Sequence, residues 1–175
     1  MYKKITISGL ICTGKTSLFW GLQEKLIWPT FSASQFFRDY SRTHNLSLEK
    51  AEEQSNILTR KIDTRMADML KSSGNIIVEG WMAGIMADEL GGVLRILLTC
   101  SDQERIHRFA NREQLSLKEA EVRVKQRENN LFKVLNKIYK RLDFLDRKNY
   151  NLIIDTTSLS KEETVATVLQ KLNRS

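Results

Sequence analysis

The sequence contains no apolar run approaching the roughly 18 residues that a membrane-spanning helix needs. A secretory leader is not expected either, because Thr6, Ser8 and Lys15 interrupt the apolar residues that follow Lys3 and Lys4. We therefore expect a cytoplasmic protein with no membrane partner.

Cysteine and proline are scarce, and there is no internal repeat or Pro/Gly-rich linker. The two cysteines, Cys12 and Cys100, have the spacing of neither a zinc site nor a disulfide framework. Of the 175 residues, 41% are hydrophobic and 28% are charged, which is typical of a globular protein with a proper core. We expect one domain, residues 1–175, and a monomer is favoured.

The chain is basic, with a net charge of +7 and a sequence pI of about 9.5. Such a charge suits nucleic acid or any phosphorylated partner. Residues 101–148 carry 13 Lys and Arg side chains against 8 Asp and Glu, so most of the basic excess lies in one helical segment.

Residues 9–16 read Gly-Leu-Ile-Cys-Thr-Gly-Lys-Thr and match the phosphate-binding loop G-x-x-x-x-G-K-[ST]. Ile5 and Ile7 alternate with polar residues before the loop, as in a short strand. After the loop, apolar residues recur at helical spacing as far as Trp28 and Pro29. A chance match in a turn before a surface helix is the alternative, and the strand and helix on either side argue against it.

The chemistry of phosphate binding explains this composition. Glycines let successive backbone N–H groups converge on phosphate oxygens at the positive end of the following helix. Lys15 is expected to reach the β- and γ-phosphates of ATP without being buried, and the Thr16 hydroxyl to bind the Mg²⁺ ion that neutralises them. The predicted ATP-binding residues are Gly9, Leu10, Ile11, Cys12, Thr13, Gly14, Lys15, Thr16 and Ser17.

Short apolar runs at residues 4–8, 30–32, 76–79, 94–99 and 152–155 read as strands, with helical patterns between them. This alternation predicts an α/β fold with a mostly parallel five-stranded sheet.

Helix starts carry a second local signal, a serine followed three residues later by Gln or Glu, which is typical of an N-cap. The four such serines are Ser32, Ser101, Ser116 and Ser160. Residues 48–71 and 117–146 also have helical patterns, the second with a candidate break near Asn129 and Asn130.

Phosphate loops serve kinases, GTPases, motors and transport ATPases. The chain has no Asn-Lys-x-Asp guanine-specificity motif and no second domain to drive, which favours a small kinase. Such an enzyme must neutralise the transferred phosphoryl group, and arginine does so best because its guanidinium binds two phosphate oxygens. The cationic candidates are Arg38, Arg108, Arg112, Lys125 and Arg127; taken singly, each is more simply a solvated helix side chain.

Further motifs accompany these residues. They are Phe-Ser-Ala-Ser-x-Phe-Phe-Arg at 31–38, Ile-Asp-x-Arg at 62–65, Val-Glu-Gly-x-x-Ala-Gly at 78–84, Arg-x-x-x-Arg-Glu at 108–113, Arg-Glu at 127–128, Ile-Tyr at 138–139 and Leu-Ile-Ile-Asp-Thr at 152–156. With them, about residues 3–172 resemble the archaeal-type cytidylate kinases, in the nucleoside monophosphate kinase group of phosphate-loop enzymes. The resemblance implies a three-layer P-loop kinase fold with a helical lid, and transfer of the ATP γ-phosphate to CMP or dCMP with Mg²⁺.

The resemblance also implies roles for individual residues. The implied partners are small nucleotides, and nucleic acid is not expected. Acceptor-binding helices would span about residues 33–72, and a mobile lid about residues 105–130. Thr16 and Glu79 would serve the metal, Glu79 through a bound water. The implied catalytic residues are Lys15, Arg108, Arg112 and Arg127, and the implied acceptor-binding residues are Arg38, Asp63, Arg65, Gly80, Trp81 and Lys125.

The chain departs from its relatives at two positions. It has Trp81 where they usually carry an arginine after Glu-Gly, and Ser34 where they tend to carry glycine. Loss of one phosphate-binding arginine would weaken acceptor binding by about 2 kcal/mol. Trp81 either stacks on a base or packs against the protein. Two alternatives to a CMP kinase therefore stand: a P-loop kinase for another small acceptor, and an ATP-binding or ATPase module without kinase activity.

Overall fold

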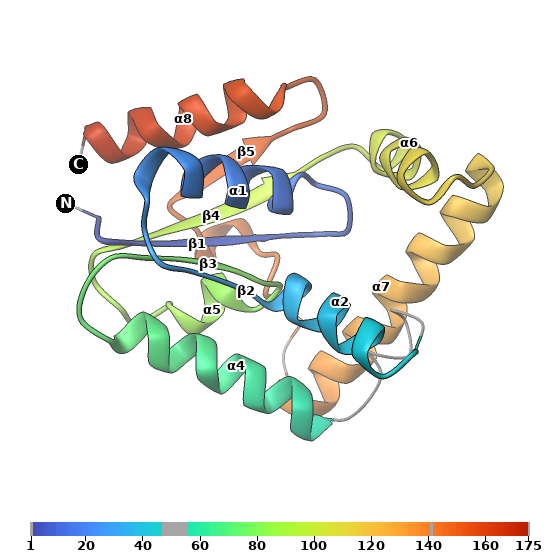
Figure 1. Ribbon diagram of the computed structural model, residues 1–175, viewed down its shortest axis with the longest axis horizontal. Helices are drawn as coiled ribbons and strands as arrows, with labels where there is room; N and C mark the ends of the chain where they lie inside the picture. Colours follow the sequence, from blue (N-terminus) through green and yellow to red (C-terminus); the bar gives the residue numbers. More distant parts are fainter. Residues whose placement is uncertain (1, 47–55, 141, 175) are drawn as a thin grey trace.

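The computed structural model describes residues 2–46, 56–140 and 142–174 (Figure 1). Its centre is a five-stranded sheet in the order β2-β3-β1-β4-β5, and every neighbouring pair of strands is parallel. The strands are β1 (Lys4–Gly9), β2 (Thr30–Ser32), β3 (Ile76–Glu79), β4 (Val93–Thr99) and β5 (Leu152–Asp155). The sequence prediction of five strands is confirmed to within one residue at each end.

Helices cover both faces of the sheet and make three layers (Figure 1). α1 (Lys15–Leu26) and α8 (Lys161–Asn173) lie on one face, while α4 (Asn56–Lys71) and α5 (Ala83–Met86) lie on the other. Each face has its own apolar core, one built around Leu18 and Phe19 of α1 and the other around Met66 and Leu70 of α4. Because both faces are covered, β3, β4 and β5 are mostly apolar, and the polar Thr6 and Ser8 that alternate with isoleucine in β1 are buried as well.

The remaining helices lie beyond the carboxyl ends of the strands, where ligands bind in parallel α/β sheets (Figure 1). They are α2 (Ala33–Thr43), α6 (Asp102–Glu113) and α7 (Leu117–Tyr139), and a short 3₁₀ helix, η1 (Arg147–Asn149), precedes β5. The predicted lid falls within α6 and α7. The predicted acceptor-binding helices correspond to α2 and α4, and the part of that prediction at 47–55 lies outside the described residues.

The four predicted N-caps are confirmed. Each serine oxygen accepts a hydrogen bond from the backbone N–H three residues later, at 3.0–3.3 Å. At Ser116 and Ser160 the glutamate also returns a bond to the cap backbone, which completes a capping box. These caps fix where α2, α6, α7 and α8 begin.

The predicted course of α7 was wrong in two respects. The helix runs unbroken through Asn129 and Asn130. Beyond them, Leu135 of the same helix is buried in an apolar cluster with Phe144, and this packing outweighs the weak helix propensity of asparagine. It also ends at Tyr139 rather than near Asp146, with Lys140 in the left-handed conformation at φ 55° as its C-cap.

Candidate active site

The phosphate loop joins β1 to α1 and contains three residues with positive φ. These are Gly9 at 150°, Cys12 at 60° and Gly14 at 90°. A Cβ atom at Gly9 would lie 2.5 Å from the Leu98 carbonyl oxygen, so glycine is required there. Inside the loop, the Thr13 hydroxyl donates to the Leu10 carbonyl at 2.9 Å.

Lys15 is buried, contrary to the prediction from sequence, with 7% of its surface exposed. Its Nζ donates to the Leu10 carbonyl at 2.7 Å and lies 5.3 Å from the centroid of the Trp81 ring. The carbonyl and the indole face together accommodate an ammonium group that the aliphatic stem carries inward. Burial lowers the pKa of Lys15, and the nearby Glu79 carboxylate opposes that shift.

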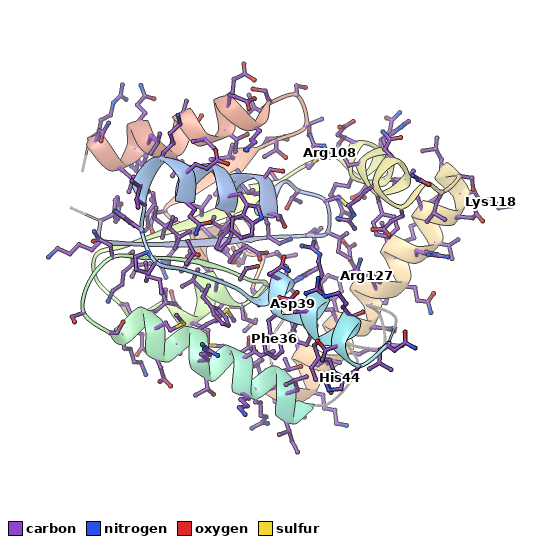
Figure 2. All side chains as sticks on the ribbon, viewed as in Figure 1. Phe36, Asp39, His44, Arg108, Lys118 and Arg127 are labelled. Carbon is purple, nitrogen blue, oxygen red and sulfur yellow. The ribbon has the colours of Figure 1, made fainter. Side chains whose placement is uncertain are left out.

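A cleft of about 300 Å³ opens beside this loop and brings together five cationic side chains from four helices. The cations are Lys15 of α1, Arg38 of α2, Arg108 and Arg112 of α6, and Arg127 of α7. Figure 2 shows Arg108 and Arg127 on the sides of α6 and α7 that face the rest of the molecule, and Lys118 at the outer end of α7. The other lining residues are Ile11, Cys12, Gly14, Thr16, Ser17, Ser34 and Trp81.

The three arginines that α6 and α7 contribute to the cleft are held differently. Arg108 connects α6 to the start of the β5–α8 loop: its Nη2 donates to the Thr156 carbonyl at 2.6 Å, and its Nε to Glu104 at 2.9 Å. Arg112 is 43% exposed at its side chain and pairs with Glu113 at 2.8 Å. Arg127 is buried, and its guanidinium lies 6.0 Å from the centroid of the Phe109 ring.

Glu79 ends β3 as a fully buried carboxylate beside the phosphate loop. Ser32 and Ser34 donate to its two oxygens at 2.5 and 2.8 Å. The glycine that the family resemblance leads us to expect at position 34 would have no side chain to make the second of these bonds. The β1–β3 register pairs Glu79 with Ile7, two residues before the loop begins at Gly9.

A second, smaller cavity of about 50 Å³ adjoins the cleft, and Ser34 and Trp81 line both. Its walls are mainly apolar and carry one carboxylate, Asp63, which accepts a hydrogen bond from the Tyr139 hydroxyl at 2.6 Å. Burial raises the pKa of Asp63 to about 6, against the lowering effect of that hydrogen bond. The remaining walls are Ala33, Phe37, Thr59, Met66, Met82, Leu131 and Leu135.

Trp81 is half-buried and packs against the apolar core. Its ring makes edge-on contacts with Phe132 and Phe144, both at centroid distances of 6.1 Å. The same ring faces Lys15 and lines both cavities, so with Ser34 it forms the wall between the cationic cleft and the Asp63 cavity.

Three of the predicted acceptor residues do not line either cavity. Lys125 is exposed and pairs with Glu121 at 2.5 Å on its own helix. Arg65 is also exposed, and its guanidinium lies 5.3 Å from the centroid of the Phe31 ring. Gly80 is buried below the site, where a Cβ would lie 3.0 Å from the Met66 sulfur, so it serves close packing.

Sequence reasoning missed three residues that contact the phosphate loop. Arg105 and Glu128 form a buried ion pair that binds the backbone of Ile11. Only the Arg-Glu motif at 127–128 marked this region, and it gave no role to Glu128. Thr156 was also given no role; its hydroxyl donates to the Thr13 carbonyl at 3.0 Å.

The parallel sheet and the glycine loop between β1 and α1 have the architecture of the P-loop kinase fold class. Solved structures support the fold: shikimate kinase from Acinetobacter baumannii has a TM-score of 0.64 over 99% of this chain and 94% of its own, at 14% identity. A gluconokinase from Sinorhizobium meliloti has a TM-score of 0.65 over 98% and 91%, at 13% identity. The cytidylate kinase-like family model matches residues 22–158, and the chain belongs to this family.

Similar full-length sequences agree with that assignment. The chain is 32% identical to the cytidylate kinase of Methanocorpusculum labreanum, over 94% of this chain and 93% of that protein. It is 31% identical to the cytidylate kinase of Sulfolobus acidocaldarius, over 98% and 94%. The chain is accordingly a phosphotransferase of the cytidylate kinase-like type, and membership of this kinase family implies ATP as the phosphoryl donor. Among the described residues, no helix is both long and apolar enough to span a membrane.

Proposed function

We propose that this enzyme transfers the γ-phosphoryl group of ATP to a pyrimidine nucleoside monophosphate, with CMP or dCMP as the preferred acceptor. The observation that carries the proposal is the junction at Ser34 and Trp81 between a cationic cleft and an apolar cavity with one carboxylate. A nucleoside monophosphate has the matching parts, an anionic phosphate and a planar base with hydrogen-bond donors.

The base of the acceptor is assigned to the Asp63 cavity. An ionised carboxylate accepts the hydrogen bond that the exocyclic amino group of cytosine donates, whereas uracil presents a carbonyl oxygen there. The cavity of about 50 Å³ is narrower than a typical ligand site. Acceptor binding therefore requires the walls from α2, α4 and α7 to separate.

The donor nucleotide is assigned to the other side of the loop. A third cavity there is lined by Gly14, Ser17 and Leu18 of the phosphate loop and α1, and by Thr156 and Leu159 of the loop between β5 and α8. Arg108 lines both this third cavity and the cationic cleft. The base of ATP occupies the third cavity in this proposal, and its phosphates pass the Arg108 guanidinium into the cleft.

Thr16 and Glu79 are proposed to serve the metal. A threonine hydroxyl and a carboxylate are oxygen ligands of the kind Mg²⁺ takes, and Mg²⁺ usually completes its shell with water and phosphate oxygens. Across residues 2–46, 56–140 and 142–174, no group of three or more His, Cys, Asp or Glu side chains could hold a metal by itself. A bound Mg²⁺ would neutralise the β- and γ-phosphates.

Transfer in this site depends on position and charge. The acceptor phosphate is already ionised, so no side chain has to remove a proton from it. Lys15 and the cleft arginines of α6 and α7 (Arg108, Arg112 and Arg127) bear on the charge of the transferring group, and Arg38 binds the acceptor phosphate. Closure of α6 and α7 over the cleft would exclude water and suppress hydrolysis of ATP.

One observation favours a second candidate, a kinase for a small acceptor other than a nucleotide. The indole of Trp81 occupies the position of the arginine expected to bind the acceptor phosphate, and it is packed among aromatic rings. Without an arginine at position 81, Arg38 is the one cleft cation assigned to the acceptor phosphate. An acceptor with less negative charge would suit this arrangement.

An ADP-release assay with ATP, Mg²⁺ and a panel of acceptors tests the proposal. The panel contains CMP, dCMP, UMP, AMP and GMP, together with hydroxylated acceptors that carry no phosphate. We expect the highest kcat/KM for CMP or dCMP. Turnover of only a phosphate-free acceptor would establish the second candidate, and ADP release independent of every acceptor would establish an ATPase.

A further inference from the structure

A buried ion pair connects α6 and α7 to the phosphate loop. Arg105 of α6 and Glu128 of α7 are 4% and 8% exposed, and Arg105 Nη1 donates to Glu128 Oε1 at 2.5 Å. The pair also binds both backbone groups of one loop residue. The Ile11 N–H donates to Glu128 Oε1 at 3.3 Å, and Arg105 Nη1 donates to the Ile11 carbonyl at 3.1 Å.

The side chain of Ile11 packs between the same two helices, α6 and α7. It is buried in an apolar cluster with Phe109 and Ala110 of α6 and with Ala120 and Val124 of α7. A residue of the phosphate loop thus completes the core between α6 and α7. Because packed cores resist partial displacement, movement of these helices carries Ile11 with them.

The conformation of the next residue, Cys12, depends on these hydrogen bonds to Ile11. Cys12 has φ 60°, a left-handed conformation that non-glycine residues seldom adopt and that persists only where the surroundings enforce it. The carbonyl of Ile11 and the N–H of Cys12 share one peptide plane and point in opposite directions. By binding the Ile11 carbonyl, Arg105 therefore sets the direction of the Cys12 N–H, and Cys12 lines the cleft.

We propose that Arg105 and Glu128 are positioning residues for the triphosphate of ATP. Neither side chain is among those that line the cleft, so the pair acts through the backbone of Ile11 and Cys12. It holds the phosphate loop in its binding conformation and transmits movement of α6 and α7 to it. The identity of the nucleotide rests on the proposed function.

A double variant, Arg105→Met with Glu128→Leu, separates positioning from stability. Replacing a buried ion pair by apolar side chains of similar size often leaves a protein as stable as before or more so. The variant nevertheless removes both bonds to Ile11. Because the Ile11 N–H and carbonyl lose these partners, we expect a modestly lower Tm for a variant that still folds, and a Kd for ATP, measured by calorimetry, raised by about tenfold. The Kd for CMP should stay within about twofold of wild type.

A matched control uses the ion pair between Arg95 and Asp88, whose side chains line neither the cleft nor the Asp63 cavity. Arg95→Met with Asp88→Leu removes the same chemical groups, and ATP affinity should not change. The conservative Arg105→Lys variant provides a second measurement if the apolar double variant does not fold. It keeps the charge but loses the guanidinium fork, so it should weaken ATP binding in the same direction.

The outcomes separate this inference from the proposed function. Unchanged ATP affinity in the double variant, or in Arg105→Lys, would overturn it, as would failure of the wild-type protein to bind ATP. An equal loss of ATP affinity in the Arg95 control would overturn it too, because the effect would then be general. If the wild-type protein phosphorylates no nucleoside monophosphate, but ATP binding still weakens in the double variant alone, the inference stands and the proposed function fails.

Discussion

The ammonium group of Lys15 lies 5.3 Å from the centroid of the Trp81 ring. This contact joins the phosphate loop to the segment after β3, at the wall between the cationic cleft and the Asp63 cavity. A tryptophan at this position serves as a neutral partner for Lys15, where an arginine would place a second cation beside it.

Trp81→Arg is expected to destabilise the protein and to weaken CMP binding. The change removes the packing of the indole on Phe132 and Phe144 and brings two cations together, at a cost of about 2–4 kcal/mol in the free energy of unfolding. Urea unfolding and calorimetric titration with CMP measure the two effects. Trp20→Arg is the control, because Trp20 is 41% exposed on α1.

The opposite result would be informative about the site. If CMP bound about tenfold more tightly to Trp81→Arg, the acceptor site would still have the geometry for two phosphate-binding arginines, with Arg38 as the other. The account of Trp81 as a packed wall residue would then be wrong.

Lys15→Ala is expected to lower kcat for phosphoryl transfer by at least about a hundredfold, since it removes a charge that acts on the transferring phosphoryl group. Because Lys15 is buried and bonded to Leu10, we also expect a loss of about 1–2 kcal/mol in unfolding free energy. Steady-state assays and urea unfolding check the two. Lys25→Ala, at an exposed site on the same helix, should change neither, and turnover near wild type in Lys15→Ala would contradict the assignment of the loop.

Arg38 and Arg112 should separate kinetically, although both line the cleft. Arg38→Ala is expected to raise the KM for CMP by about tenfold or more with little change in the KM for ATP, because Arg38 is placed on the acceptor phosphate. Equal effects on both substrates would place Arg38 elsewhere.

Arg112→Ala is instead expected to lower kcat by about tenfold to a hundredfold with small changes in either KM. Its side chain is partly exposed and its guanidinium pairs with the neighbouring Glu113, so it can turn toward charge that develops during transfer. A change confined to KM would remove Arg112 from the catalytic set.

The sequence predicted features whose signals are local. The five strands are short apolar runs, and the four serine caps need only a partner three residues away. The strand order was not predicted, because it depends on contacts across the whole chain. The pair of Arg105 with Glu128 spans 23 positions and forms only when α6 packs on α7. The burial of Lys15 likewise depends on Trp81, which lies in a distant segment.

The Asp63 carboxyl makes stability depend on pH, and Asp63→Asn should remove that dependence. Its pKa is raised from 3.8 to about 6 by burial, so between these values the folded protein binds more protons than the unfolded chain. Stability therefore falls as the pH rises through this range, by on the order of 3 kcal/mol from this one group. The asparagine variant should match wild type near pH 4 and exceed it at pH 8 in urea unfolding.

The same variant tests the role of Asp63 in acceptor binding. If the ionised carboxylate accepts a hydrogen bond from cytosine, the affinity of the wild-type protein for CMP should rise with pH through about 6. The CMP phosphate titrates near pH 6 too, but it does so equally with both proteins. The difference between the two pH profiles is therefore assigned to Asp63. Asp68→Asn, at an exposed site on α4, serves as the control, and parallel profiles for wild type and Asp63→Asn would exclude Asp63 as a contact of the base.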